Sequence, residues 1–197
     1  MRRRALLLVD VQNDFCPGGA LPVPEGDRIV PVLNQYARRF ADEGRPVFAS
    51  RDWHPEVTSH FMDQGGPWPP HCIADTEGAA FHPELKLPET AEVITKGTDP
   101  TDDGYSAFEA EDRQGRKFPT LLHTDNVRHL YVGGLATEYC VRASVLDGLR
   151  EGLDVVVLLD AVRGIDVEEG AVVRAIDEML RAGARTATLA TIDEELK

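Results

Sequence analysis

Cys140 has the residue type and the setting of a covalent nucleophile. It follows an apolar run and a glycine-containing turn, at a point where a helix is expected to begin. A helix N-terminus favours negative charge and lowers the pKa of a thiol, and an adjacent base can remove its proton. Asp10 and Lys96 also follow apolar runs, and they supply a base and a cation to hold the pair in place. Taken singly, Cys140 could be a small buried apolar residue, Asp10 a carboxylate that caps a loop, and Lys96 a surface charge. The other two cysteines, Cys16 and Cys72, lack this context and are interpreted as structural.

A second group of residues has the types that bind a metal. One carboxylate and three imidazoles lie close together in the sequence, at Asp52, His54, His60 and His71. Such ligands suit one divalent transition metal ion per chain, with Zn²⁺ preferred and Fe²⁺ or Mn²⁺ as alternatives. Side chains at i and i+2 of an extended segment share a face, so Asp52 and His54 can point to one ion. His60 is the candidate for the fourth ligand, although Ser59 could act through a water molecule instead. The alternative for all three imidazoles is that they are ordinary surface histidines.

These side chains need a scaffold, and the sequence predicts a parallel sheet. Six short apolar runs, rich in Val, Leu and Ile, cover residues 5–11, 46–50, 92–95, 129–132, 155–159 and 185–189. They are apolar nearly throughout rather than alternating with polar residues. That pattern is typical of strands buried on both faces of a parallel sheet.

Helical periodicity fills several of the intervals between the runs. Apolar residues recur at three- and four-residue spacing over 29–36, 141–149 and 172–180. A glycine follows each segment, where a helix end favours a left-handed residue. Alternating β and α elements predict a three-layer α/β/α sandwich, with the whole chain, 1–197, as one domain.

Two regions, 12–27 and 52–90, interrupt this alternation. They hold most of the prolines together with aromatic residues and histidines, so we interpret them as ordered active-site loops. Ligands of open α/β sheets bind outside the carboxyl ends of the strands. The titratable residues that follow four of the runs are therefore expected at one rim: Asp10, Asp52, Lys96 and Asp160.

The overall charge excludes several classes of partner. The chain has 34 Asp and Glu against 21 Lys and Arg, a formal net charge of −13. Phosphate groups need a basic face, so neither nucleic acid nor an anionic membrane is expected as a partner. No stretch approaches the roughly 20 apolar residues of a membrane helix. The apolar run after the basic residues 2–4 is too short for an export signal. Three cysteines are too few for a disulfide framework, so we expect the protein in the reducing cytoplasm.

Five segments together resemble the nicotinamidase/pyrazinamidase branch of the isochorismatase-like cysteine hydrolases. They are DVQNDF at 10–15, DWHP at 52–55, GPWPPHC at 66–72, KGTD at 96–99 and GLATEYCV at 134–141. The resemblance spans nearly the whole chain and implies a six-stranded, mainly parallel sheet of Rossmann-like topology. True isochorismatases lack the nucleophilic cysteine, so Cys140 speaks against that activity.

The resemblance also assigns roles to individual residues. It implies a catalytic triad of Asp10, Lys96 and Cys140. It implies an oxyanion hole formed by the backbone N–H groups of Ala136 and Cys140, with a cis peptide bond before Ala136. The implied metal ligands, in a family variant with a third histidine, are Asp52, His54, His60 and His71.

The implied reaction is the hydrolysis of nicotinamide to nicotinate and ammonia, with pyrazinamide as a further substrate. Cys140 would attack the carboxamide carbon after Asp10 takes its proton, and water would then hydrolyse the thioester. A flat pyridine ring is best held between aromatic faces. The expected substrate contacts are Phe15, Trp68 and Tyr105, with Leu135 beside them; the alternative is that the aromatic side chains only pack the loops.

Three other functions are compatible with these residues. A related amidase for another small amide would use the same site. A receiver-like signalling module also has strand-end aspartates and a bound cation, but its Mg²⁺ would prefer oxygen ligands to three histidines. The third is a catalytically silent metal-binding scaffold. Ammonia release from nicotinamide would distinguish an enzyme from a signalling module and from a silent scaffold. The sequence leaves open whether the chain forms a homo-oligomer.

Overall fold

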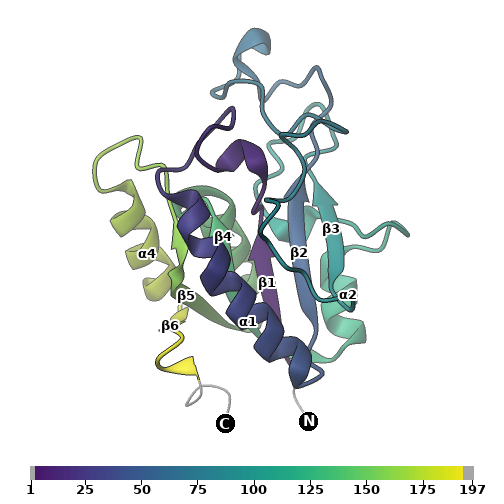
Figure 1. The fold of residues 1–197 in the computed structure, drawn as a ribbon, viewed down its shortest axis with the longest axis vertical. Helices are drawn as coiled ribbons and strands as arrows, with labels where there is room; N and C mark the ends of the chain where they lie inside the picture. Colours follow the sequence, from purple (N-terminus) through teal and green to yellow (C-terminus); the bar gives the residue numbers. More distant parts are fainter. Residues whose placement is uncertain (1–2, 193–197) are drawn as a thin grey trace.

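Six parallel strands form the central sheet in the described part of the chain (Figure 1). This computed structural model describes residues 3–192; residues 1–2, at the start of the basic segment considered as an export signal, and residues 193–197 lie outside it. The strands are β1 (Arg3–Val9), β2 (Val47–Asp52), β3 (Glu92–Lys96), β4 (Val127–Leu135), β5 (Asp154–Arg163) and β6 (Arg185–Ala187). Their order across the sheet is β3-β2-β1-β4-β5-β6, with every neighbouring pair parallel. The predicted α/β class and Rossmann-like topology are confirmed.

Burial on both faces explains why the strand sequences are apolar nearly throughout. In β1, Leu6 and Leu8 pack in the core on one face of the sheet, and Leu7 and Val9 pack on the other. Successive side chains of a strand point to opposite faces, so a strand covered on both sides has no solvated face. The buried run of β1 therefore leads directly into Asp10, at the carboxyl end of the sheet.

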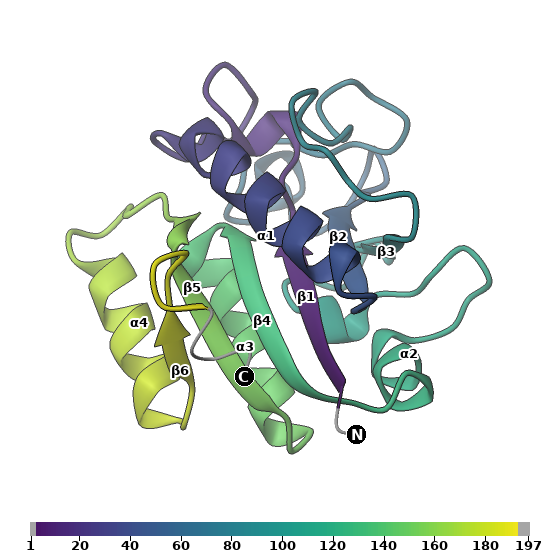
Figure 2. The ribbon, with the colours of Figure 1, turned by 60° about the horizontal axis from the view of Figure 1, so that its bottom comes forward.

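The α-helices of the described residues cover both faces of the sheet. They are α1 (Val30–Asp42), α2 (Phe118–Thr124), α3 (Arg142–Arg150) and α4 (Ala171–Arg181). Leu33 of α1 packs in the same core as Leu6, whereas Leu121 of α2, Val145 of α3 and Met179 of α4 pack in the core on the opposite face. Figure 2 shows α1 in front of the sheet and α3 behind it, which gives the predicted three layers.

Three of these helices confirm the predicted periodic segments. The glycines that follow them have positive φ values, 64° at Gly44, 78° at Gly152 and 112° at Gly183, as expected at helix ends. Helix α2 was not predicted, because its seven residues are too few to show a helical period.

Region 12–27 and most of region 52–90 lie over the carboxyl ends of the central strands (Figure 1). The last part of the second region runs back along α1, where Asn34 bonds to Glu84 and Lys86. The two regions contain the 3₁₀ turns Asn13–Phe15 and Met62–Gln64, and a further 3₁₀ turn, Gly26–Ile29, leads into α1. Most of both regions therefore lies where a ligand site of this fold is expected. No helix among residues 3–192 is long and apolar enough to span a membrane.

The prediction that Asp160 reaches the ligand-binding rim is wrong. The predicted strand 155–159 continues well past Asp160, because β5 follows β4 beyond an irregularity in their register. Asp160 instead accepts hydrogen bonds from the Tyr36 hydroxyl and from the Leu189 N–H, both at 2.8 Å. Leu189 lies just past the end of β6. This strand stops at Ala187, whereas the predicted run continued to residue 189.

Candidate active site

Asp10, Lys96 and Cys140 form one buried cluster at the carboxyl end of the sheet. Lys96 Nζ lies 2.8 Å from Asp10 Oδ2 and 3.5 Å from Cys140 Sγ. The same ammonium group donates to Gly104 O at 2.8 Å and pairs with the Asp52 carboxylate. The structure thus brings the three predicted catalytic side chains around a single nitrogen atom, and all of them are buried.

Strand register explains how this cluster is assembled. Asp52 and Lys96 are paired residues at the ends of β2 and β3, and Asp10 directly follows β1, the next strand. Asp10 has a φ of 49°, and its N–H donates to Ser50 O at 3.2 Å. Ser50 Oγ donates to Asp10 Oδ1 at 2.7 Å. With one carboxylate oxygen fixed by Ser50, the other faces Lys96.

Burial dominates the electrostatics of the cluster. It raises the pKa of Asp10, an effect that Lys96 opposes and Asp52 reinforces. Burial alone would lower the pKa of Lys96, but the two carboxylates outweigh it and raise that pKa well above its usual range. Burial also raises the pKa of Cys140 against the effect of Lys96, so the expected lowering by a helix N-terminus is wrong in this setting. The raised pKa of Asp10 makes its carboxylate a stronger base than that of an ordinary aspartate.

Cys140 lies in the turn that joins β4 to α3. Residues Thr137–Val141 form a π-helical turn, a feature that is frequent at functional sites. Ser144 Oγ donates to Cys140 O at 2.7 Å and accepts the Ala107 N–H at 2.9 Å. This buried hydroxyl connects the turn that carries the thiol with the chain segment that follows β3.

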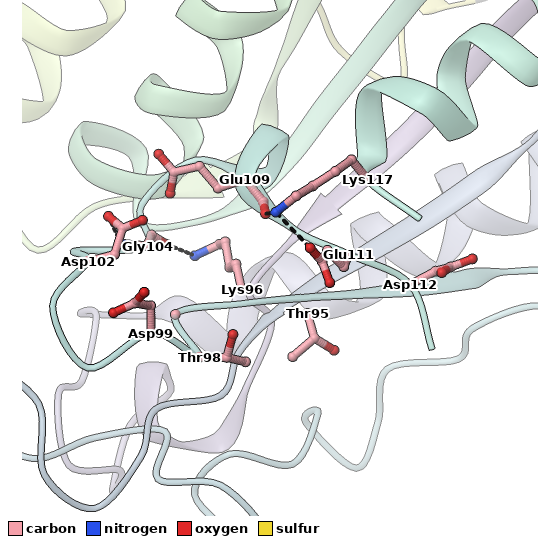
Figure 3. Close-up of a pocket in the computed structure, with 11 residues that line it drawn as sticks. Thr95, Lys96, Thr98, Asp99, Asp102, Gly104, Glu109, Glu111, Asp112 and Lys117 are labelled. Atoms are coloured by element: carbon pink, nitrogen blue, oxygen red, sulfur yellow. Dashed lines mark hydrogen bonds and ion pairs between the residues drawn. The ribbon is translucent and has the colours of Figure 1, made fainter. Parts of the chain in front are cut away.

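A cavity of about 450 Å³ borders Lys96 (Figure 3). Its wall is mainly acidic, with carboxylates from Asp99, Asp102, Glu109, Glu111 and Asp112. Lys117 Nζ pairs with Glu111 Oε1 at 2.8 Å and donates to Glu109 O at 3.2 Å. Neither Cys140 nor a histidine lines this cavity, so it is not where the candidate nucleophile acts.

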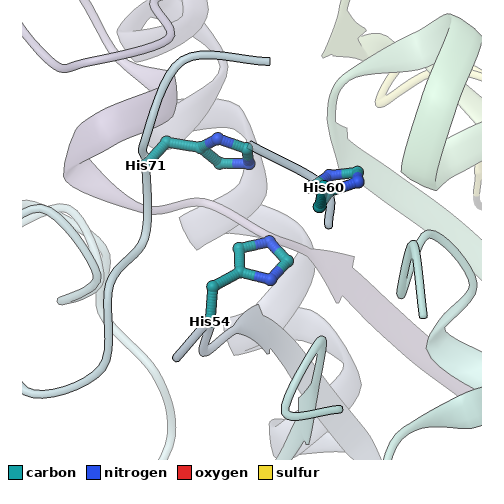
Figure 4. A group of neighbouring side chains, drawn as sticks. All are labelled: His54, His60 and His71. Carbon is teal, nitrogen blue, oxygen red and sulfur yellow. The ribbon is translucent and has the colours of Figure 1, made fainter. Parts of the chain in front are cut away.

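Three buried imidazoles converge near the cluster (Figure 4). One ring nitrogen from each of His54, His60 and His71 lies within 4.8 Å of the others. His54 Nδ1 bonds to Gly97 O at 3.0 Å, and His71 Nδ1 bonds to Pro69 O at 2.8 Å. Because a carbonyl oxygen only accepts, Nδ1 carries the proton in both rings and each Nε2 keeps its lone pair. Two of the three histidines are thus in the tautomer that binds a metal through Nε2.

The donor set fits a divalent ion. His54 Nε2 is buried and has no hydrogen-bond partner within the described chain, which leaves an acceptor atom orphaned. Burial, followed by the neighbouring His71 and His60, lowers the pKa of His54 to about 3. Burial also lowers the pKa of His71, so both rings are neutral, as ligands must be. Asp52 Oδ2 lies 3.8 Å from His54 Nε2 and adds a carboxylate.

The segment 97–105 contacts the histidines from one side. Gly97 has a φ of 68°, and a Cβ at this position would lie 2.7 Å from His54 Cε1. Glycine is therefore required for the backbone to approach the ring and accept its N–H. Asp103 Oδ1 lies 3.4 Å from His60 Nδ1, so the same segment places a carboxylate beside the third ring.

A small cavity is bounded by the thiol and by two of the histidines. It has about 20 Å³ of free space, room for about one water molecule. Three predicted aromatic contacts line it, and Trp68 Nε1 donates to Tyr105 OH at 2.8 Å. The lining residues are Phe15, Leu21, Asp52, His60, Trp68, His71, Tyr105, Ala136, Tyr139, Cys140 and Ile165.

Leu135, predicted as a substrate contact, does not line this cavity. Its side chain is buried in the core on the α1 face of the sheet, beside Gly26. Ala136 takes its place in the wall. The Leu135–Ala136 peptide bond is cis, as the resemblance implied. The chain therefore leaves β4 at Leu135, in the core, and reaches the wall of the site at Ala136.

Three lining residues were missed from the sequence. Tyr139 precedes Cys140 and packs edge-on against Trp68 with ring centroids 4.9 Å apart; its position in the nucleophile turn could have indicated it. Leu21 and Ile165 are apolar loop residues from opposite ends of the chain. Nothing in their local sequence distinguishes them from ordinary packing residues.

Known proteins resemble this chain over almost all of its length. A family model described as the Isochorismatase domain matches residues 4–193. The chain is 42% identical to a nicotinamidase of Escherichia coli, covering 98% of this chain and 99% of that protein. It is 38% identical to a nicotinamidase/pyrazinamidase of Mycobacterium tuberculosis, covering 91% and 95%. The solved structure of the pyrazinamidase of Pyrococcus horikoshii in complex with zinc has a TM-score of 0.87 and 45% identity, covering 95% of this chain and 99% of that one.

Proposed function

The chain belongs to the isochorismatase domain family, and we propose that it is a metal-dependent nicotinamidase that converts nicotinamide to nicotinate and ammonia. Pyrazinamide, a similar small aromatic amide, is its second substrate. The observation that carries this proposal is the buried cluster of a carboxylate, a lysine and a thiol beside three buried histidines. The names of the full-length relatives support the choice of substrate.

In the first half of the reaction, Asp10 accepts the proton of the Cys140 thiol. The sulfur attacks the carboxamide carbon, and the carbonyl electron pair moves onto oxygen. The N–H groups of Ala136 and Cys140 stabilise that oxyanion. The electron pair then returns, the C–N bond breaks, and Asp10 gives its proton to the departing nitrogen. Ammonia leaves and a thioester remains on Cys140.

In the second half, Asp10 removes a proton from water, which attacks the thioester carbon. The C–S bond breaks, Cys140 recovers the proton, and nicotinate leaves. Lys96 stays protonated throughout, because two carboxylates raise its pKa well above the usual range. Its charge holds Asp10 in place and offsets the negative charge on sulfur as the proton leaves.

We assign the metal to His54, His60, His71 and Asp52. A set rich in imidazole favours Zn²⁺ over a hard ion such as Mg²⁺, and the zinc complex of the Pyrococcus horikoshii relative supports the same choice. When bound, the ion supplies Lewis acidity and a coordination position for a ring nitrogen. The sequence alternative that Ser59 replaces His60 is less well supported, since His60 is the residue that lines the cavity.

The pyridine ring is assigned to the aromatic wall formed by Phe15, Trp68 and Tyr105. Because the cavity has room for only about one water molecule, these side chains must move apart to admit a substrate. The described cysteines are all free, which supports a reducing, cytoplasmic location. The exposed Val173 and Leu180 of α4 are compatible with a homo-oligomer, which light scattering of the purified protein would measure.

The experiment that tests this function is ammonia release by the purified, zinc-loaded protein with three amides. Nicotinamide should react fastest. Benzamide keeps the ring and the amide but lacks the ring nitrogen, so its kcat/KM should be lower. An aliphatic amide of similar size lacks both features and should react slowest. Equal rates for all three would replace this proposal with the alternative of a general amidase, and no ammonia from any of them would favour a silent metal-binding scaffold.

A further inference from the structure

Gln12 is a fully buried polar residue that the proposed reaction does not use. Its side-chain amide makes three hydrogen bonds of 2.8 Å. The Nε2 group donates to Asp52 O and to Ala79 O, and Oε1 accepts the Asp52 N–H. A single side chain thus satisfies both backbone groups of one proposed metal ligand.

The position of Asp52 in the sheet explains why those backbone groups are available. β1 pairs with β2 only as far as Val9 and Ser50, whereas β2 continues to Asp52 on its other edge, against β3. At its last residue β2 therefore has a strand neighbour on one side only. A primary amide has the same donor and acceptor as a peptide group, so Gln12 replaces the missing length of β1.

Gln12 is itself held against the backbone of Asp10, the other acidic residue of the cluster. Its backbone N–H donates to Asp10 O at 2.8 Å. One residue therefore contacts the chain at both Asp10 and Asp52, whose carboxylates share Lys96 Nζ. The remaining oxygen of Asp52 is the one that faces His54, at 3.8 Å.

We propose that Gln12 is a positioning residue that fixes Asp52 as a metal ligand by completing the edge of β2. This inference rests on the proposed metal site. With the backbone of Asp52 bound on both edges, its carboxylate keeps one oxygen on Lys96 and directs the other to the ion. Groups that orient the ligands of a metal typically contribute 10- to 100-fold to its affinity.

Asn13 provides a matched control on the same turn. Its Nδ2 donates to Glu77 O at 2.8 Å, so it also ties the first irregular region to the second through a side-chain amide. Its side chain makes no hydrogen bond with Asp52 within residues 3–192, and it is half-buried where Gln12 is fully buried. Loss of the Asn13 amide removes a loop contact without releasing the metal ligand.

The test measures the Zn²⁺ dissociation constant of the full-length protein by competition with a chelator, for the wild type, Gln12→Leu, Gln12→Glu and Asn13→Ala. Gln12→Leu should raise the constant by about 10- to 100-fold. Gln12→Glu keeps the acceptor for the Asp52 N–H but loses both donors, so its constant should lie in between. Asn13→Ala should stay close to the wild type, and excess Zn²⁺ should restore activity to Gln12→Leu.

Each other outcome is decisive. A wild-type protein that binds no Zn²⁺ would overturn the proposed metal site rather than the role of Gln12. Normal Zn²⁺ affinity in folded Gln12 variants would overturn the positioning role. The same follows if Asn13→Ala weakens binding as much as Gln12→Leu. If neither Gln12 variant folds while Asn13→Ala does, Gln12 serves stability and the inference fails.

Discussion

The two halves of the site are built on different kinds of backbone. Asp10 and Lys96 stand at the ends of β1 and β3, on either side of β2, and Cys140 lies one turn beyond β4, so the hydrogen bonds of the sheet position the triad. His60 and His71 come from the irregular region 52–90. There the backbone is joined by isolated bridges, such as those of His54 with Ile73 and Phe61 with Trp68.

The two halves of the site are therefore held rigid by different interactions. The triad is fixed by the cooperative core and should persist as long as the domain is folded. His54 and His71 are each held by one hydrogen bond to a carbonyl group. In the proposed site, the bound ion would hold all three histidines together. Asp52 belongs to both halves, since it ends a strand and faces a histidine, so it is the residue through which one half is coupled to the other.

The largest effect is expected from removing the nucleophile. This change should abolish turnover, and the strand-end residues and the histidines should keep their positions. Cys140→Ala should lower kcat by more than about 10³-fold, because the covalent intermediate cannot form. Zn²⁺ content by elemental analysis should remain that of the wild type. As a control, Cys16→Ala changes a thiol buried in the core and should retain activity. Mass spectrometry finding the adduct of an aldehyde inhibitor on Cys16 or Cys72 would contradict the assignment.

Removing the metal should separate the two halves. Chelation should abolish most of the activity while the circular dichroism of the sheet is retained. At a Zn²⁺ concentration 100-fold above its dissociation constant, the ion stabilises the fold by about 2.7 kcal/mol, so chelation should lower the Tm. His71→Ala should lack this Zn²⁺-dependent shift, whereas Cys140→Ala should keep it. Full activity in metal-free protein would show that the histidines are not needed.

A smaller effect is expected at the aromatic wall of the cavity. Tyr105→Phe removes the acceptor of the Trp68 Nε1–H bond, and a hydrogen bond contributes about 0.5–1.5 kcal/mol. The KM for nicotinamide should therefore rise by a few-fold to about tenfold, with less change in kcat. Tyr36→Phe makes the same chemical change in the scaffold, where the hydroxyl bonds to Asp160. It should lower stability and leave KM unchanged; equal effects on KM would remove the distinction between site and scaffold.

The smallest effect concerns the surface pair between α3 and α4, which supports the sheet half from outside. Arg142 donates to both oxygens of Glu178 at 2.7 and 2.8 Å, and this hydrogen bonding lowers the pKa of Glu178. A carboxyl group whose pKa is lowered on folding stabilises the fold above its unfolded pKa, and this stabilisation is lost as the pH falls through the folded pKa. Glu178→Gln should have a slightly lower Tm than the wild type at pH 7, and the difference should vanish in acid. A difference that persists below pH 3 would show that the charge is not responsible.

Local sequence determined much of this protein. Continuous apolar runs predicted buried parallel strands, and Asp10, Asp52 and Lys96 lie at or just beyond the ends of the first three strands. Because parallel strands all end at the same edge, the convergence of these groups followed from the pattern itself. The histidine cluster was likewise visible, since its members lie within one irregular region.

Only the tertiary structure decided what depends on neighbours distant in the sequence. It extended β5 past Asp160, buried Leu135 in the core, and brought Leu21 and Ile165 to the cavity. Burial also reversed the expected direction of the Cys140 pKa shift, because desolvation of the thiolate outweighs the lowering effect of Lys96. Residue type and spacing report the conformation of a short segment. Burial and partners arise from which strands pair and where each strand ends, and those are set by contacts between segments far apart in the chain.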